Sequence, residues 1–300
     1  MIVRLISAGA LFLLSASVWA VSPYIKGNTV AAGNVQAVAS AVETKLKGGG
    51  FKVVGKYFPK TLAGYGVVIA TDDAMLDAVG SVGGHAVMGA AIRVGVKEDG
   101  SVAYTNPDYW YRAYFRKDFD KKEEAVKALQ ARLGNTLGAG KGLGGDEPPA
   151  NLTNYRYMIG MERLDSYKNK LAEYGSFAEA LKAVRDNLAK GAGKTAKVYE
   201  VVMPDRKLAV FGVAMNESGI SDGEWISKID MQESVAGLPY EIYVVDNTVN
   251  APHGRFRIAL AFPDVGMGQF MRISVLPNAI IETMSTIAGA EKKSSGEAWQ

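Results

Sequence analysis

The apolar positions in the first half of the chain follow a helical period and then a strand period. Val35, Val38, Val42 and Leu46 recur every three or four residues before the glycines at 48–50, which predicts an amphipathic helix that ends there. Beyond the glycines, β-branched and aromatic residues dominate, as is typical of strands. In chain order, the predicted elements are a helix over 34–46, strands over 51–58 and 65–70, a short helix over 72–79, strands over 87–97 and 101–106 that flank an Asp-Gly turn, and a helix over 121–133.

The second half repeats this order of elements. Its predicted elements are a strand over 155–161, a helix over 177–188, strands over 197–202 and 208–215, a short helix near Trp225, strands over 240–245 and 255–262, and a C-terminal helix through Ile281, Met284 and Ile287. Matching residues keep the same order in both halves, for example Leu62 with Leu208 and Gly66 with Gly212, which indicates a diverged internal duplication. The predicted fold class is α+β, with two similar domains, each a mostly antiparallel sheet packed by helices in the order β-α-β-β-α-β-β-α.

A stretch rich in glycine and proline separates the halves and is typical of a linker. Within it, Gly140, Gly142 and Gly145 have the spacing of a dinucleotide-binding loop, but they follow a predicted helix rather than a strand, so no cofactor is expected. The predicted organisation is a signal peptide over 1–20, a first α+β domain over 21–134, the linker over 135–152, a second α+β domain over 153–290 and a flexible tail over 291–300.

The N-terminus has the pattern of a secretory signal peptide. Arg4 precedes an apolar run over 5–14, and small residues lead to an expected cleavage site after Ala20. We therefore expect a periplasmic or secreted protein with no membrane span once the segment is removed. An uncleaved N-terminal anchor is the alternative, although the apolar run is short for a membrane span.

Composition narrows the chemistry further. The chain has no cysteine, which excludes disulfides, thiolate nucleophiles and cysteine-ligated metals. Its 34 basic and 31 acidic residues give a formal charge of only +3, and no basic stripe is interleaved with aromatic residues. Nucleic acid is therefore not an expected partner.

Residues 92–107 carry a signature of two strands around the Glu98-Asp99-Gly100 hairpin, with Tyr104 and Asn106 at the end of the second strand. This signature resembles that of the Domain of Unknown Function 302 family. The resemblance places Tyr109 and Arg112 at the aromatic and arginine positions of a following helix. It implies an α+β fold with a mostly antiparallel sheet, and it implies no established activity.

The two halves match the family signature to different extents. The second half is similar in Leu238-Pro239, the start of one family strand, whereas the first half has Ala90-Ala91 at that place. In turn, the second half lacks the tyrosine and asparagine at the end of the second strand. If these two residues form a site in the family, only the first half retains it.

The densest group of aromatic residues with polar tips lies around this signature, and it gives the candidate ligand site Tyr104, Asn106, Tyr109 and Arg112, to which we add His85. The aromatic rings would stack on a flat ligand while Asn106 and Arg112 bind its polar edge. The alternative is structural, with Asn106 in a strand-to-helix turn and the aromatic residues packing the helix on the sheet. Neither His85 nor His253 is expected to bind a metal, because both lie beside glycine in predicted loops.

The predicted function is that of an exported, non-catalytic protein that binds a small molecule or a protein partner, with a homodimer as a further option. No catalytic residue, cofactor or metal is assigned. The alternative is a small-molecule hydrolase that uses His85 with Asp72 or Asp73. The two readings differ in what they require, because a hydrolase needs His85 within hydrogen-bond reach of a carboxylate and a binding protein needs an apolar concavity.

Overall fold

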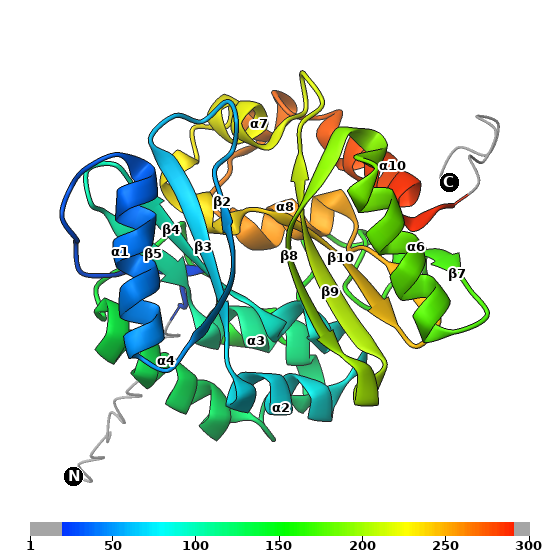
Figure 1. Ribbon diagram of the computed structural model, residues 1–300, viewed down its shortest axis with the longest axis horizontal. Coiled ribbons are helices and arrows are strands. Elements are labelled where there is room, and N and C mark those ends of the chain that lie inside the picture. The colour runs from blue at the N-terminus through cyan, green and yellow to red at the C-terminus, as the bar shows by residue number, and fades with distance from the viewer. Residues whose placement is uncertain (1–19, 291–300) are drawn as a thin grey trace, which may run out of the picture.

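A computed structural model describes residues 20–290 of the chain. Except for Ala20, the predicted signal peptide lies outside the described residues, and so does the tail over 291–300. The described chain is an α+β fold of two antiparallel sheets packed by helices (Figure 1).

The first sheet has the strand order β2-β3-β4-β5-β1-β6 and the second has the order β7-β11-β10-β9-β8. All strand pairs are antiparallel. The strands of the first sheet are β1 (Tyr24–Lys26), β2 (Lys52–Tyr57), β3 (Tyr65–Thr71), β4 (Ile92–Lys97), β5 (Val102–Thr105) and β6 (Gly142–Leu143). Those of the second sheet are β7 (Lys170–Glu173), β8 (Thr195–Met203), β9 (Leu208–Met215), β10 (Tyr240–Val245) and β11 (Thr248–Asn250).

Helices cover the outer faces of the sheets and close the ends of the molecule. The α-helices are α1 (Val35–Gly48), α2 (Asp73–Val82), α3 (Pro107–Phe115), α4 (Glu123–Leu137), α5 (Pro149–Leu152), α6 (Phe177–Ala189), α7 (Asp222–Lys228), α8 (Gly254–Ala261), α9 (Met267–Met271) and α10 (Leu276–Ala288). The 3-10 turns are η1 (Gly84–Ala90), η2 (Arg116–Asp118), η3 (Tyr167–Asn169), η4 (Ala192–Lys194), η5 (Pro204–Arg206) and η6 (Gln232–Gly237). In Figure 1, α1 lies on the outer side of the first sheet, and α6 and α10 lie on that of the second.

The helices predicted from periodicity are confirmed, because each has a marked apolar stripe. In α1 the buried residues include Val38, Val42 and Leu46, and the side chain of Asn34 accepts a hydrogen bond from the Ala37 backbone nitrogen at the N-terminus. The strands predicted over 51–58, 65–70, 197–202 and 208–215 are found as β2, β3, β8 and β9, and the predicted hairpin is found as β4–β5. Sequence pattern identifies a strand where apolar and polar residues alternate, and a helix where apolar residues recur on one buried face.

Three predicted strands differ from the structure. Residues 254–261 form α8, which is buried around its whole circumference except at Arg255, so it has no polar face to reveal a helical period. Residues 155–161 contain no strand, and the first strand of that half is β7. The predicted strand over 87–97 begins only at Ile92, because 84–90 form η1.

The glycine-rich segment 135–152 contains regular structure, contrary to its composition. It includes the end of α4, all of α5 and the edge strand β6, whose Gly142 and Leu143 pair with Ile25 and Tyr24 of β1. A Cβ on Gly142 would lie 2.1 Å from the Ser22 hydroxyl oxygen, so this edge of the sheet needs glycine. The separation into two domains with the predicted boundaries stays a prediction.

The two sheets meet closely along their edges. Strands β2 and β8 lie side by side at the centre of the molecule (Figure 1), and a Cβ on Gly55 would lie 2.6 Å from the Val198 carbonyl oxygen. Turn η6 packs on β4, where Gly95 leaves room for Ala236, while η1 packs on β9 and β10. Each half therefore places a 3-10 turn against the sheet of the other, and one continuous buried cluster runs through both sheets.

A buried carboxylate fixes α7 against the first sheet. One oxygen of Asp222 accepts hydrogen bonds from the Tyr57 hydroxyl (2.7 Å) and from the Met215 backbone nitrogen (2.9 Å). Its other oxygen accepts one from the Trp225 indole nitrogen (3.2 Å). Burial raises the pKa of Asp222 to about 6, although these hydrogen bonds act in the opposite direction.

Asp222 should therefore make stability depend on pH in an identifiable window. Because its pKa is higher in the folded chain than in the unfolded chain, folding favours the protonated form, and stability falls as the pH rises from about 4 to about 6. The shift corresponds to roughly 3 kcal/mol over that window. Urea unfolding at pH 4, 5, 6 and 7 should show that Asp222→Asn removes this loss of stability. If the free energy of unfolding varied with pH in the same way in the unaltered protein and in the variant, the role of Asp222 would be disproved.

Candidate functional site

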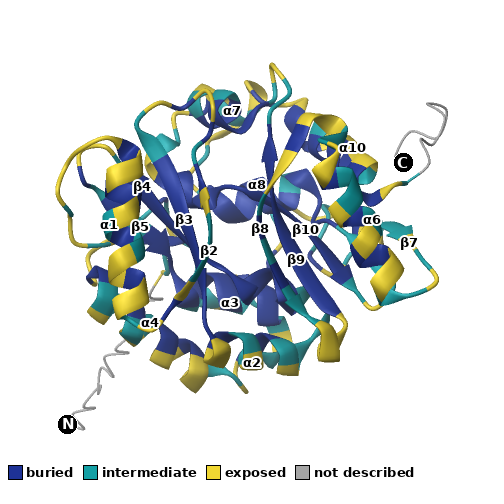
Figure 2. Cartoon of the chain, viewed as in Figure 1, coloured by how far each residue is buried: buried dark blue, intermediate teal, exposed yellow. Residues whose placement is uncertain are grey.

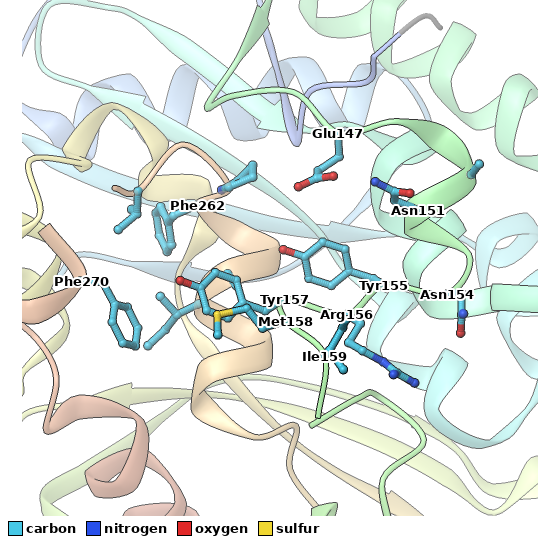
Figure 3. A pocket seen from close by; sticks show the side chains of 15 residues that line it. Glu147, Asn151, Asn154, Tyr155, Arg156, Tyr157, Met158, Ile159, Phe262 and Phe270 are labelled. Carbon is cyan, nitrogen blue, oxygen red and sulfur yellow. The ribbon is translucent and has the colours of Figure 1, made fainter. Parts of the chain in front are cut away.

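The described residues line an open cavity of about 580 Å³ beside α5, α8 and α9 (Figure 3). The segment 154–159 forms one wall and residues 258–270 form the other. Its apolar lining includes Met158, Ile159, Ile258, Phe262, Val265 and Phe270. The lining is therefore assembled from two segments that are about a hundred residues apart in the sequence.

Aromatic packing positions the wall over 154–159. The ring of Tyr155 meets that of Phe256 edge-on, with centroids 5.8 Å apart, and the ring of Tyr157 lies 6.3 Å from that of Phe270. These contacts turn the tyrosines toward α8 and α9 and leave Met158 exposed beside them. The segment has no strand partner, so side-chain packing rather than a backbone ladder shapes this wall.

Hydrogen bonds and ion pairs anchor the rest of this loop. The Asn169 side-chain nitrogen donates to the carbonyls of Arg163 (3.0 Å) and Leu164 (2.8 Å), and its oxygen accepts from the His253 backbone nitrogen. Asp165 forms an ion pair of 2.6 Å with Arg116. The loop that forms the cavity wall is thus tied both to the start of α8 and to the first half of the chain.

Among the described residues, polar groups contribute about as much of the cavity surface as apolar groups do. The polar side-chain groups are those of Glu147, Asn151, Asn154 and Arg156, and the hydroxyls of the two tyrosines. In Figure 3 the Glu147 carboxylate and the Tyr155 hydroxyl lie toward the hollow, whereas Arg156 extends away from Glu147. Burial raises the pKa of Tyr155, and the negative charge of Glu147 raises it further.

The backbone on both sides of Glu147 is fixed. Glu147 and Val21 exchange two backbone hydrogen bonds, of 2.9 and 3.0 Å, so residue 147 extends the sheet edge beyond β6. The next two residues are prolines, and they begin α5. The side chain therefore projects from a defined position, although no ion pair or hydrogen bond of its carboxylate occurs among residues 20–290.

The sequence-predicted residues of β5 and α3 lie elsewhere and are engaged with backbone groups. The hydroxyl of Tyr104 donates to the Gly138 carbonyl (3.0 Å) and that of Tyr109 to the Leu260 carbonyl (2.9 Å). Asn106 begins α3, and its side-chain nitrogen donates to the Ser22 carbonyl (2.8 Å). These three residues are buried, and a ligand role for them stays a prediction.

Arg112 and His85 complete the predicted set, and neither lines the large cavity. Arg112 pairs with Asp108 one helical turn earlier (2.8 Å), and its guanidinium lies 4.0 Å from the centre of the Phe119 ring. His85 is half-buried in η1, and burial lowers its pKa. Its nearest influential charges are those of Asp165 and Arg116. The structure thus gathers four of the five predicted residues on β5 and α3 and leaves His85 on a separate turn.

The carboxylates considered for hydrolysis have other partners. Asp72 accepts a hydrogen bond from the Met75 backbone nitrogen (2.7 Å) as the cap of α2, and it forms an ion pair with Arg132. Asp73 pairs with Lys52 at 2.6 Å. Within residues 20–290 no group of three or more histidine, aspartate or glutamate side chains is placed to hold a metal ion.

Sequence pattern does not identify the cavity residues, because it predicts strands over 155–161 and 255–262 and a linker over 135–152. A weak signal existed in Tyr155-Arg156-Tyr157-Met158-Ile159, where aromatic and aliphatic residues gather with a single charge and no buried partner strand. Among the described residues, no helix has the length and apolar character that crossing a membrane requires.

Comparison with known proteins gives no match. No family model matches the chain, and neither a curated protein nor a solved structure is similar to it at the threshold applied. The resemblance to the Domain of Unknown Function 302 family therefore stays a prediction.

Proposed function

We propose that the protein binds a small organic molecule in the cavity between α5, α8, α9 and the segment 154–159. One observation carries this proposal: a hollow of about 580 Å³ whose lining is shared between aromatic and aliphatic side chains and polar groups. Small-molecule sites have this size, and their polar groups fix the orientation of the ligand. No catalytic role is proposed for any residue.

The walls suit a ligand with a flat apolar body. Phe262 and Phe270 come from one side of the cavity and Tyr157 from the other, and all three present aromatic surface. Ile159 is 95% exposed beside the cavity and would be partly covered by a bound ligand. For a two-ring compound the expected dissociation constant is about 10–500 µM, from the affinity that small ligands gain per atom.

The site is proposed to work outside the cytoplasm, in the periplasm or after secretion. The support is the signal-peptide pattern of residues 1–20, of which only Ala20 lies among the described residues. A protein of this kind would meet its ligand in a compartment without strong reductants, and the absence of cysteine removes any dependence on that redox state.

The two halves are proposed to descend from one duplicated unit. The first half runs β1-α1-β2-β3-α2-η1-β4-β5-α3, and the second runs β7-α6-η4-β8-η5-β9-α7-η6-β10-β11-α8, which is the same order with the short turns η4 and η5 added. The pairings β2–β3 and β8–β9 each contain a register shift, which ends at Gly55 and at Tyr199. A bulge at the same place in both sheets is a specific sign of common origin.

The bulges also set which residues correspond. Gly55 pairs with Ile69, which pairs with Arg93, while Tyr199 pairs with Gly212, which pairs with Glu241. In this register Gly212 corresponds to Ile69, three residues from the partner suggested by the sequence match. Arg93 and Glu241 then occupy equivalent positions of the two sheets.

The binding proposal predicts that filling the cavity abolishes binding. We expect Ala150→Trp to weaken binding of the neutral probe 1-naphthalenemethanol at least tenfold, because Ala150 lines the cavity from α5 and is itself exposed. Isothermal titration calorimetry measures the effect. The matched control is Ala131→Trp on the exposed side of α4, which should leave the affinity unchanged. Equal binding of the probe by both variants would refute the proposal.

A further inference from the structure

We propose that the ligand of the cavity is an organic cation, an amine or quaternary ammonium on a flat apolar body, and that Glu147 supplies its counter-charge. This inference rests on the proposed function and adds the chemical class of the ligand. It depends on the position of the Glu147 carboxylate, on the aromatic surface around it and on the direction in which the Arg156 side chain extends.

The carboxylate of Glu147 is placed for a cation from outside the chain. It lines the cavity and is half-buried, and among residues 20–290 no cationic side chain pairs with it. A bound cation would supply the counter-charge that no side chain among residues 20–290 gives this carboxylate. The paired backbone hydrogen bonds with Val21 hold the backbone of Glu147 in place, so binding a ligand costs little entropy for ordering this segment.

Aromatic side chains surround the same space. Figure 3 shows Tyr155 and Phe262 on either side of the hollow below Glu147, with Tyr157 and Phe270 further along it. Aromatic faces attract ammonium groups through their quadrupole, and cages of several such faces bind quaternary ammonium ligands. The apolar body of the ligand would lie toward Phe270, away from Glu147.

A second acidic side chain lies near this end of the cavity. Asp264 lies beside the segment that leads to Glu147, since a Cβ on Gly145 would be 2.9 Å from the Asp264 Cβ. Among residues 20–290, Arg156 is the only cationic residue that lines the cavity, and it is exposed and extends away from Glu147 (Figure 3). An anionic ligand would therefore meet Glu147 without a compensating cation deep in the site, which favours the cationic class.

Three naphthalene probes of equal shape test the inference: 1-naphthylmethylammonium, neutral 1-naphthalenemethanol and 1-naphthoate. Calorimetric titration of the full chain at pH 7 and low salt should rank the cation at least tenfold tighter than the alcohol and the anion weakest. Glu147→Gln should abolish the preference for the cation while changing the affinity for the alcohol less than threefold. Glu282→Gln on the exposed side of α10 makes the same change in net charge and should leave the ranking intact.

The outcomes separate this inference from the proposed function. If the alcohol binds and the cation binds no tighter, or if the anion binds best, the cation inference fails while the binding function stands. If none of the three probes binds, the proposed function fails as well. A preference for the cation that survives Glu147→Gln would overturn the role assigned to Glu147.

Discussion

Glu241→Gln is expected to lower the free energy of unfolding by about 3–5 kcal/mol, because it leaves two buried arginines without their counter-charge. Glu241 on β10 is fully buried and binds Arg257 of α8 through two hydrogen bonds, of 2.8 and 3.2 Å. It also forms an ion pair with Arg93 of β4, in the other sheet. Figure 2 shows β4, β10 and α8 as buried elements. Urea unfolding at pH 7, followed by tryptophan fluorescence, measures the change.

The comparison variant is Glu233→Gln. Glu233 pairs with Lys97 at 2.9 Å, but its side chain is 60% exposed, so solvent screens the interaction and the loss should be far smaller. Replacing all of Glu241, Arg93 and Arg257 by methionine removes the charges together and should restore much of the lost stability. If Glu241→Gln and Glu233→Gln lowered the free energy of unfolding equally, the buried ion pairs of Glu241 would not stabilise the contact between the two sheets.

The sequence could predict elements whose residues share one buried face. The helix α6 is an example, since Ala180, Leu181, Val184 and Leu188 are its buried residues and recur at helical spacing. The hairpin between β4 and β5 was also predictable, because Asp-Gly marks the turn and Gly100 has a φ of 84°. Local chemistry decides such features, so local pattern reveals them.

Contacts between distant segments could not be predicted in the same way. Helix α8 is buried by both halves, so its apolar run carries no period, and η6 is positioned only by packing on β4. The cavity likewise needs residue 147 and residues 258–270 to come together. Neither segment has a pattern that identifies its partner, because the contact depends on the tertiary arrangement.

The sequence also does not reveal which groups the polar tips of the predicted aromatic site contact. The sequence indicates that Tyr104, Tyr109 and Trp110 carry polar tips but not whether those tips meet a ligand or a carbonyl. In the structure, the Trp110 indole nitrogen donates to the Pro23 carbonyl at 2.8 Å, as the tyrosines do to other carbonyls. A hydrogen bond to a ligand and one to a backbone carbonyl satisfy the same donor, so the sequence alone does not show which of the two is formed.

Trp110→Leu is expected to lower the free energy of unfolding by about 3–5 kcal/mol, as large aromatic truncations in cores do. The guanidinium groups of Arg93 and Arg257 lie 4.7 and 5.0 Å from the Trp110 ring centre, so the ring contacts both arginines of the buried network. Trp110→Phe keeps an aromatic face there, whereas leucine does not.

The difference between the two variants isolates this electrostatic contact from simple packing. Phenylalanine keeps an aromatic ring face beside the buried guanidinium groups of Arg93 and Arg257. Trp110→Phe should therefore be about 1–2 kcal/mol more stable than Trp110→Leu. Both lose the hydrogen bond to the Pro23 carbonyl, so that loss cancels in the comparison. Urea unfolding of the pair at pH 7 measures it, with Tyr167→Leu as the control because that side chain is 84% exposed. Equal stabilities for the phenylalanine and leucine variants would mean that the ring fills space without stabilising the excess positive charge of Arg93 and Arg257.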